Sequence, residues 1–537
     1  MTGSVPIPST VRELIEVRAE IRGEHPLLIC DDQTLTYADA AVRSADLASG
    51  FIGSGLALGS RVGLIYPNGP EFAVASLAAA RIGVVTVPLS TFSTVSELRT
   101  LLRNADVDAV LAAPEYRRHD YTQILSEAVP ELDLQSVPPL FSPLVPALRT
   151  VAFDAPESNV DRAWTVQSVL EAGRSVSSEV LQASQAQVKP SDRLVIVHTS
   201  GSTAEPKGVV HTHGSLISHL HVLNQLRRYK EHEILFCNAP FFWIGGYAYA
   251  LLGTLVAGGT LVCSNAAEPS AILDLIERTQ PTMVNGFAQS VADLPIDPSF
   301  PQRDLTSIKR GNLYPIMTDA VRPTDPGLRH NMLGMTETGS VCLASDDESE
   351  QPERRRGSFG RPVADVEAKV IDSESGAVIV SSENGELCLR GPALMEGYWG
   401  KERHETFDRD GWFHTGDLFH VDEDGFFYFE GRQGEMIKTS GANVSPREVE
   451  AAVQEETGLI AHVFGLDDAA SGQIVSAIVR VQSDAAPDPE QLKLRLRNRL
   501  SAYKVPKRII FIDEEDVPMM TSGKLDMRAL KEIFGGE

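Results

Sequence analysis

The stretch Thr199–Gly208 reads Thr-Ser-Gly-Ser-Thr-Ala-Glu-Pro-Lys-Gly and follows closely on the apolar, β-branched run Leu194–Val197. Such a run has the composition of a buried strand. A strand that ends in a loop of hydroxyls, glycine and one lysine offers backbone N–H groups, side-chain hydroxyls and a point cation, which together suit a polyphosphate. The spacing differs from Gly-x-x-x-x-Gly-Lys-Ser/Thr and argues against a P-loop NTPase. Taken alone, the loop is equally compatible with an ordinary surface loop.

Composition excludes several classes of protein. The chain has 537 residues, of which 42% are apolar and 23% charged, as in a globular protein of more than one domain. Its 48 basic and 73 acidic residues give a net charge of −25, which argues against a nucleic-acid-binding face. The five cysteines are scattered without a C-x-x-C motif, and the N-terminus lacks the pattern of a secretion signal. We therefore expect a cytoplasmic protein, although a hydrophobic substrate would allow loose association with a membrane.

Strand-like and helix-like segments alternate over residues 35–114 and again after residue 209. This alternation predicts right-handed crossovers and mostly parallel sheets flanked by helices. The expected strands include Val62–Ile65, Val84–Leu89, Val107–Ala112, Ile234–Cys237 and Thr282–Asn285, and the expected helices include Glu71–Ile82, Ser96–Asn104, Leu216–Tyr229 and Ala271–Thr279. Residues 130–192 are rich in Pro, Ser and Gln and predict a meandering connection, whereas residues 293–330 favour no element.

The segment Phe236–Ala267 carries no charged residue and is long enough to span a bilayer. It also contains Pro240 and five glycines. We predict a strand–turn–helix–turn–strand unit inside a protein core and no integral membrane segment.

Beyond residue 357 short strands and turns indicate a β-rich subdomain, and Gly431–Glu435 is the expected domain boundary. The fold prediction is α/β, with a large N-terminal AMP-binding domain over residues 1–433 that includes the β-rich subdomain, and a small mobile α+β domain over residues 434–537. Its expected elements are Arg447–Glu456, Ala461–Gly465, Ile474–Val481, Pro489–Leu500, Arg508–Ile512 and a closing helix from Asp526.

The segment Asn331–Glu337 reads Asn-Met-Leu-Gly-Met-Thr-Glu and presents a hydroxyl beside a carboxylate. With ATP nearby, Glu337 suits Mg²⁺, which prefers carboxylate and phosphate oxygens, and Thr336 suits the α-phosphate. Taken alone, the pair is equally typical of a helix N-cap.

Asp417 and Lys524 are two further candidates for contact with ATP. Asp417, in the segment Trp412–Leu418, suits both hydroxyls of a ribose, although a turn aspartate that bonds its own backbone is the commoner use. Lys524 follows a Ser-Gly turn and is either a solvated lysine or a cation that neutralises two anions which must approach each other.

In combination these segments strongly resemble the AMP-forming adenylate-forming superfamily, which contains acyl-CoA synthetases, firefly luciferases and peptide-synthetase adenylation domains. The resemblance runs from Leu35 to Lys524, and each motif is weak alone but specific in this order. The ordered segments are Thr199–Gly208, Leu333–Glu337, Trp412–Leu418, Gly431–Glu450 and Pro518–Lys524.

The resemblance implies a reaction in two halves with ATP, Mg²⁺ and coenzyme A. A carboxylate would attack the α-phosphate to form an acyl-adenylate, and the small domain would then swing about a hinge near Glu435 so that a thiol can attack. The resemblance places Thr199, Ser200, Gly201, Ser202, Thr203 and Lys207 at the phosphates, Glu337 and Thr199 at Mg²⁺, Thr336 and Lys524 at the reacting groups, Gly311, Asn312 and Leu333 at adenine, Asp417 and Arg432 at ribose, and Lys438 and Gly441 in the second half.

The segment Pro240–Gly246 is similar to the acyl-pocket motif of the superfamily, in which amino-acid-activating members carry an aspartate. Here the predicted pocket residues are apolar, namely Phe242, Trp243, Ile244 and Gly246, whereas Phe241 is equally suited to the core. This favours an uncharged fatty or aromatic acid. Coenzyme A and the phosphopantetheine of an acyl carrier protein remain alternative acceptors because both present the same thiol arm.

The sequence departs from the pattern of the superfamily at four places: Ala204 for glycine, Leu333 for an aromatic residue, Arg310–Leu313 for the adenine-contacting turn, and Trp243 for histidine. The residues expected to carry the chemistry are all present, which favours an active enzyme. A nucleotide-binding relative of low activity and an oxygenase similar to luciferase are the alternatives.

Overall fold

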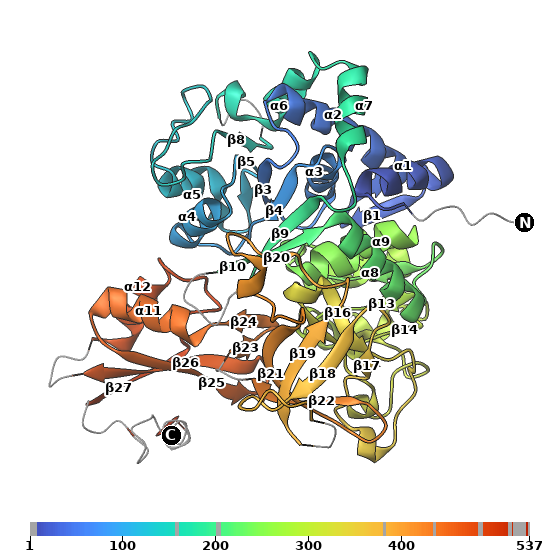
Figure 1. The fold of residues 1–537 in the computed structure, drawn as a ribbon, viewed down its shortest axis with the longest axis vertical. Coiled ribbons are helices and arrows are strands. Elements are labelled where there is room, and N and C mark those ends of the chain that lie inside the picture. Colours follow the sequence, from blue (N-terminus) through green and yellow to red (C-terminus); the bar gives the residue numbers. More distant parts are fainter. Residues whose placement is uncertain are drawn as a thin grey trace, which may run out of the picture. The chain divides into compact units, whose positions relative to one another are not determined.

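A computed structural model of the chain describes residues 8–155, 160–199, 206–379, 383–432, 436–481, 487–513, 518 and 533–534. The side chains of Gln289 and Arg432 lie outside this description. The chain forms two compact units (Figure 1). The first comprises Met1–Thr91, Leu101–His198 and Gly208–Gly431, and the second comprises Phe92–Thr100, Thr199–Lys207 and Arg432–Glu537.

The first sheet has seven strands in the order β20-β10-β9-β4-β3-β5-β8. Strand β3 pairs in parallel with β4 and β5, and β5 pairs in parallel with β8, so the alternation predicted over residues 35–114 is confirmed. The strands are β3 (Arg61–Ile65), β4 (Val85–Pro88), β5 (Ala109–Ala112), β8 (Thr150–Phe153), β9 (Arg193–Thr199), β10 (Lys207–Thr212) and β20 (Gly397–Tyr398). The helices around them are α1 (Val11–Arg22), α2 (Tyr37–Gly53), α3 (Pro70–Arg81), α4 (Val95–Asn104) and α5 (Tyr121–Ala128), with a small hairpin of β6 (Glu115–Tyr116) and β7 (His119–Asp120).

The second sheet has six strands in the order β14-β13-β11-β12-β1-β2. Its strands are β1 (Pro26–Cys30), β2 (Gln33–Thr36), β11 (Ile234–Phe236), β12 (Thr260–Cys263), β13 (Met283–Val284) and β14 (Arg310–Gly311). Its helices are α8 (His213–Leu226), the π-helical segment Gly245–Leu252, α9 (Gly253–Ala257) and α10 (Pro269–Thr279). The predicted strand–helix–strand unit in Phe236–Ala267 is therefore confirmed. None of the described helices is both long and apolar enough to cross a membrane.

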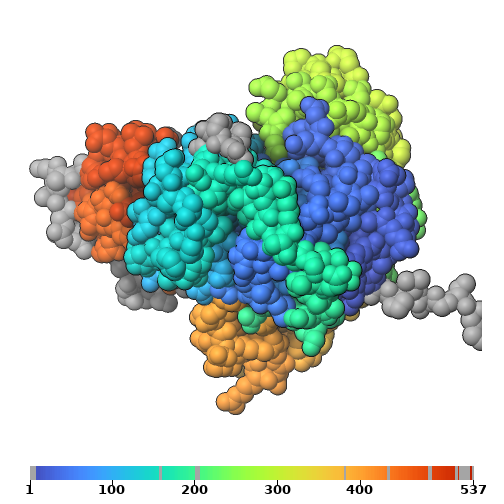
Figure 2. All heavy atoms as spheres, turned by 90° about the horizontal axis from the view of Figure 1, so that it is seen from above, coloured from blue at the N-terminus to red at the C-terminus, as the bar shows by residue number. Residues whose placement is uncertain are grey.

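The prediction of a meandering connection over residues 130–192 is wrong. This region contains β8 and the helices α6 (Val166–Gly173) and α7 (Ser178–Gln187). Helix α6 approaches α2 so closely that a Cβ at Gly53 would lie 2.3 Å from the carbonyl oxygen of Ala172. Figure 2 shows the α6 and α7 region in green-teal against the blue N-terminal helices. Packing against α2 stabilises α6, although the weak periodicity of its own sequence does not predict a helix there.

The β-rich subdomain is antiparallel. Strands β15 (Leu333–Met335), β16 (Ser340–Ala344) and β17 (Arg361–Pro362) form one small sheet, and β18 (Glu367–Ile371), β19 (Gly385–Arg390), β21 (Phe413–Val421) and β22 (Phe427–Arg432) form another. Residues 293–330, for which the sequence favoured no element, form short 3₁₀ turns around β14. These two small sheets position Glu337 and Asp417.

The second unit contains β23 (Ile437–Thr439), β24 (Ala442–Val444), α11 (Pro446–Thr457), β25 (Ala461–Asp468), β26 (Gly472–Val481), α12 (Pro489–Leu496) and β27 (Arg508–Asp513). The predicted α+β arrangement of this region is confirmed, with α12 ending four residues earlier than expected. The predicted helix from Asp526 lies outside the described residues.

A buried ion cluster lies within the second unit. The ammonium of Lys504 is 2.6 Å from a carboxylate oxygen of Glu97 and 2.7 Å from one of Glu448. Burial favours the neutral acid of Glu97, but Lys504 and the hydrogen bonds from Thr94 and Ser501 outweigh it and lower the pKa of Glu97. Glu97 is therefore ionised, and the cluster fixes the segment Phe92–Thr100 on this unit.

Candidate functional site

The predicted phosphate loop joins β9 to β10. Thr199 is the last residue of β9 and Lys207 the first of β10, and both are half-buried. Ser200, Gly201, Ser202 and Thr203 lie outside the described residues. Gly208 follows at a position where a Cβ would lie 2.8 Å from the side chain of Ile196. Strand β9 therefore leads into the loop, as the sequence predicts, and β10, which the sequence analysis did not predict, follows it.

The turn that carries Thr336 and Glu337 is fixed by three hydrogen bonds from residues distant in sequence. The ring nitrogen Nε2 of His211 donates to the carbonyl of Thr336 at 2.7 Å. The backbone N–H of Met395 donates to the carbonyl of Glu337 at 2.8 Å, and the hydroxyl of Tyr398 donates to Oε1 of Glu337 at 2.9 Å. The turn is a single 3₁₀ turn whose N-cap position is Met335, so Thr336 does not act as a helix N-cap.

His211 lies on β10 beneath this turn and is fully buried. Burial lowers the pKa of His211 to about 4, because the charged imidazolium has lost its solvation. The ring is therefore neutral at pH 7 and acts through one N–H. Nothing in the local sequence distinguishes this histidine from the others near it, and only the fold reveals its contact with Thr336.

Tyr398 reaches Glu337 because β20 pairs with β10 in antiparallel register, with Tyr398 opposite Val209. The two residues of the hydrogen bond are 61 positions apart in sequence. A hydrogen bond from a hydroxyl to a carboxylate is stronger than one between neutral groups and restricts the directions in which the carboxylate can point. Tyr398 is thus a positioning residue that the sequence analysis missed.

Asp417 lies in a bulge of β21. Opposite Leu387 of β19 stand three residues, Thr415–Asp417, because the register pairs Glu386 with Leu418 and Cys388 with His414. Oε1 of Glu386 accepts the backbone N–H of Gly416 at 3.0 Å, and the hydroxyl of Thr415 accepts that of Asp417 at 3.0 Å. Bulges of this kind commonly re-aim a side chain next to a functional site.

The bulge and the Thr336–Glu337 turn belong to one region of the first unit. Cys342 of β16 contacts the carbonyl of Leu333 through its thiol at 3.5 Å. Burial, with a smaller contribution from the negative charge of Asp417, raises the pKa of Cys342 to about 12. Leu333 and Asp417, predicted at adenine and ribose, therefore both lie near one buried thiol. Arg432 ends β22.

The predicted adenine turn is tied to the end of β13. Gly311 has φ +132°, and a Cβ there would lie 1.8 Å from the carbonyl oxygen of Val284, which only glycine tolerates. The amide of Asn312 then clamps Gly286, because its Oδ1 accepts the backbone N–H of Gly286 at 3.0 Å and its Nδ2 donates to the carbonyl at 2.9 Å. Asn312 thereby fixes the backbone directly before Phe287.

The aromatic residues of Pro240–Gly246 divide into two groups. Phe241 is fully buried and packs on Phe72 with ring centroids 5.4 Å apart, so it belongs to the core. Trp243 is half-buried and makes edge-to-face contacts with Phe242 and Phe287, with ring centroids 5.5 and 5.8 Å apart. Ile244 and Gly246 follow at the start of the π-helical segment. Phe287, which is 38% exposed, was not predicted from the sequence.

In the second unit, Lys438 lies on β23 and Gly441 lies in the tight β23–β24 turn. Thr439 pairs with Ala442, and the two turn residues Ser440 and Gly441 have φ +49° and +83°. Positive φ at both central residues is the geometry of the hairpin turn that matches strand twist. The side chain of Lys438 is exposed. Lys524 lies outside the described residues.

Comparisons with known proteins agree with this architecture. The family model described as AMP-binding enzyme matches residues 15–399, and the model described as AMP-binding enzyme C-terminal domain matches residues 448–524. A feruloyl-CoA synthase from Amycolatopsis sp. is 30% identical over 93% of this chain and 94% of its own. The mitochondrial medium-chain acyl-CoA ligase ACSF2 of Rattus norvegicus is 28% identical over 99% of this chain and 88% of its own.

Solved structures show the same fold. The amide bond synthetase McbA from Marinactinospora thermotolerans superposes with a TM-score of 0.78 at 23% identity, and the match covers 98% of this chain and 99% of that protein. The family models together cover most of the chain and both of its expected domains. The chain therefore belongs to the adenylate-forming superfamily, in its acyl-CoA synthetase branch, and is an AMP-forming acid–CoA ligase.

Proposed function

We propose that this ligase activates a hydrophobic carboxylic acid, fatty or aromatic, and transfers the acyl group to coenzyme A. In the first half, an oxygen of the carboxylate attacks the α-phosphorus of ATP, the mixed anhydride with AMP forms, and pyrophosphate leaves. In the second half, the thiol sulfur attacks the carbonyl carbon and loses its proton to solvent, the thioester forms, and AMP leaves with the electron pair of the broken C–O bond. A cytoplasmic location remains a prediction from charge and cysteine usage.

The observation that carries the choice of acid is the apolar surface around Trp243. The segment Pro240–Gly246 contains no charged residue, and its partly exposed Trp243 makes edge-to-face contact with the exposed ring of Phe287. An α-ammonium group would find no carboxylate in this segment, whereas an apolar acid would gain burial of its hydrocarbon part. The names of the relatives, medium-chain acyl and feruloyl, describe acids of this hydrophobic class.

We further propose the roles of the site residues. Thr199, Lys207 and the loop between them hold the β- and γ-phosphates, and Glu337 holds Mg²⁺ with Thr199. Gly311, Asn312 and Leu333 contact adenine, Asp417 and Arg432 bind the ribose, and Lys524 bridges the carboxylate and the α-phosphate with Thr336 beside it. Support for Glu337 comes from the geometry of its turn, because Tyr398 and Met395 fix both its carboxylate and its carbonyl. A carboxylate held in one direction suits Mg²⁺, which demands near-ideal coordination.

The test is carboxylate-dependent ATP–pyrophosphate exchange with a panel of fatty, aromatic and amino acids. We expect exchange with hydrophobic acids and none with amino acids. The exchange with hydrophobic acids should be lost in Lys524→Ala. Lys507→Ala provides a matched control, since this lysine lies on the same small unit and has no role in the proposed chemistry. Exchange with no acid would contradict the proposal and favour a nucleotide-binding relative of low activity.

A second assay decides the acceptor. The products formed with coenzyme A and with a phosphopantetheinylated carrier protein are compared by mass spectrometry. We expect the coenzyme A thioester. If only the carrier-protein thioester forms, the acceptor is a carrier protein and not coenzyme A. The proposal for the adenylation half would be unaffected.

A further inference from the structure

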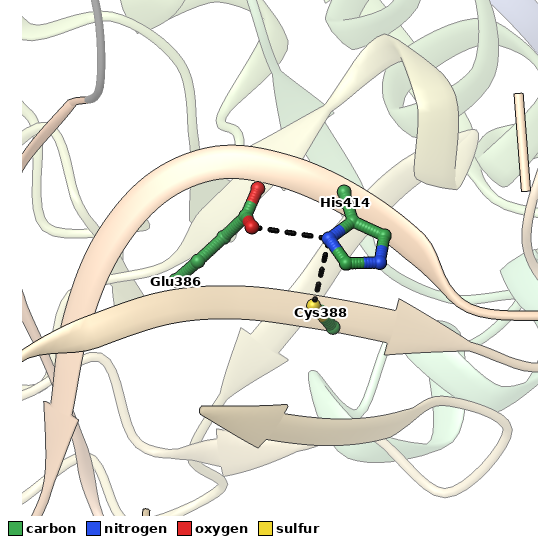
Figure 3. A group of neighbouring side chains, drawn as sticks. All are labelled: Glu386, Cys388 and His414. Carbon is green, nitrogen blue, oxygen red and sulfur yellow. Dashed lines mark hydrogen bonds and ion pairs between the residues drawn. The ribbon is translucent and has the colours of Figure 1, made fainter. Parts of the chain in front are cut away.

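Three side chains on neighbouring strands bring together the donor atoms of a transition-metal site (Figure 3). Nδ1 of His414 lies 3.6 Å from the sulfur of Cys388 and 3.0 Å from Oε2 of Glu386. The donor atoms of the three residues all lie within 4.8 Å of one another. Glu386 also holds the bulge before Asp417, but that role uses Oε1 and requires neither Cys388 nor His414.

The sheet fixes where the three residues stand. Glu386 and Cys388 are two positions apart on β19 and therefore project from the same face of the strand. His414 of β21 stands directly opposite Cys388 in the antiparallel register. The Cα atoms of all three residues are thus held by backbone pairing, and only side-chain torsions remain free to adjust to a ligand.

The distances suit tetrahedral zinc. Zn–S and Zn–N bonds of about 2.3 and 2.0 Å at tetrahedral angles place sulfur and nitrogen about 3.5 Å apart. The observed separation between Cys388 and His414 is 3.6 Å. The corresponding N···O separation is about 3.4 Å, so the carboxylate of Glu386 would move by a few tenths of an ångström. A set of thiolate, imidazole and carboxylate is one that zinc accepts readily.

The surroundings favour a cation. The other ring nitrogen of His414 faces Oδ2 of Asp408 at 3.6 Å, which leaves Nδ1 turned toward the cluster. Metal-bound histidines usually present their second nitrogen to a carboxylate in this way. Lys369 stands opposite Cys388 on β18, but its ammonium lies over the ring of Trp412, 4.3 Å from the centroid. The charged groups near the Cys388 sulfur are thus two carboxylates, those of Glu386 and Asp408, and one ammonium, that of Lys369.

We propose that Glu386, Cys388 and His414 form a Zn²⁺ site, with solvent in the fourth position. Binding releases the thiol proton of Cys388 to solvent and joins Glu386 and Cys388 of β19 to His414 of β21, which stands directly before the bulge that carries Asp417. Occupancy would therefore stabilise this sheet and hold the bulge. This inference is independent of the proposed acid and acceptor, because the site needs neither ATP nor substrate.

The test is titration of the chelator-treated, full-length protein with Co²⁺ in the absence of nucleotide, followed by displacement with Zn²⁺. We expect a thiolate-to-cobalt charge-transfer band that saturates at one equivalent, disappears on addition of Zn²⁺, and is absent from Cys388→Ser. His414→Gln, a change at a half-exposed ring, should weaken Co²⁺ binding at least tenfold. Cys237→Ser is the matched control, because Cys237 is also a buried free thiol but lies outside the cluster.

A second readout guards against misfolding of the Cys388 variant. Zn²⁺ should raise the melting temperature of the unmodified protein and of Cys237→Ser, but not that of His414→Gln. Absence of the cobalt band from the unmodified protein would overturn the proposal. Persistence of the band in Cys388→Ser, or its equal loss in Cys237→Ser, would do the same.

Discussion

Replacement of Tyr398 by phenylalanine tests the positioning of Glu337. The change removes a hydroxyl that donates to Oε1 of Glu337 at 2.9 Å and keeps the ring and the β20–β10 pairing. A hydrogen bond to a charged group contributes about 1.5–3 kcal/mol. Because every 1.36 kcal/mol corresponds to a factor of ten, complete loss of the bond would lower the rate by about 10–150-fold. Tyr398 is partly exposed, and water can replace the hydroxyl in part, so we expect a decrease of about tenfold in kcat/KM for MgATP.

The assay is carboxylate-dependent ATP–pyrophosphate exchange measured as a function of Mg²⁺ concentration. If Tyr398 orients a metal ligand, the Mg²⁺ concentration required for half-maximal exchange should rise in the variant, and excess Mg²⁺ should restore part of the rate. Tyr428→Phe is a matched control, because the hydroxyl of Tyr428 also donates to a carboxylate oxygen at 2.9 Å, that of Asp422. An equal loss of rate in both variants, or an unchanged Mg²⁺ requirement in Tyr398→Phe, would refute the reasoning.

Three further predictions concern the same unit. Glu386→Ala leaves the part-buried N–H of Gly416 without its acceptor, at a cost of about 1–3 kcal/mol, and should raise KM for ATP in steady-state assays with a smaller effect on kcat. Asn312→Ala releases the backbone before Phe287 and should raise KM for the acid as well as for ATP, whereas an effect on ATP alone would contradict the clamp. His211 has an ordinary pKa near 6.5 when unfolded and about 4 when folded, so the unfolded chain takes up the proton first as the pH falls. The free energy of unfolding should therefore drop between pH 7.5 and 5, by roughly 2 kcal/mol for this residue, and urea unfolding at the two pH values should show a smaller drop in His211→Asn.

The sequence by itself determined the alternation of strands and helices over residues 35–114 and most of the elements over residues 447–512. The short apolar run of β3 and the longer alanine-rich run of α3 are local properties, because both elements are buried at nearly every position and differ in length and residue type. The segments that contain Lys207, Glu337 and Asp417 were found in the same way, from residue types adjacent in the chain. Their order, more than any single segment, identified the superfamily.

Local patterns failed where stability comes from distant partners. Helices α6 and α7 lie in a region of weak periodicity, and α6 is stabilised by close packing on α2, which is far from it in sequence. The aromatic contact between Trp243 and Phe287 likewise depends on how β11 and β13 are placed in one sheet. A period within one segment carries no information about which other segment will cover it.

The supports of the site were decided by tertiary structure alone. Tyr398 and His211 reach the Thr336–Glu337 turn across 61 and 125 positions of sequence. Glu386 holds the bulge before Asp417 because the register of β19 on β21 leaves three residues opposite one. The sequence thus names the groups expected to touch the nucleotide, whereas their orientation depends on hydrogen bonds that exist only after distant strands have paired.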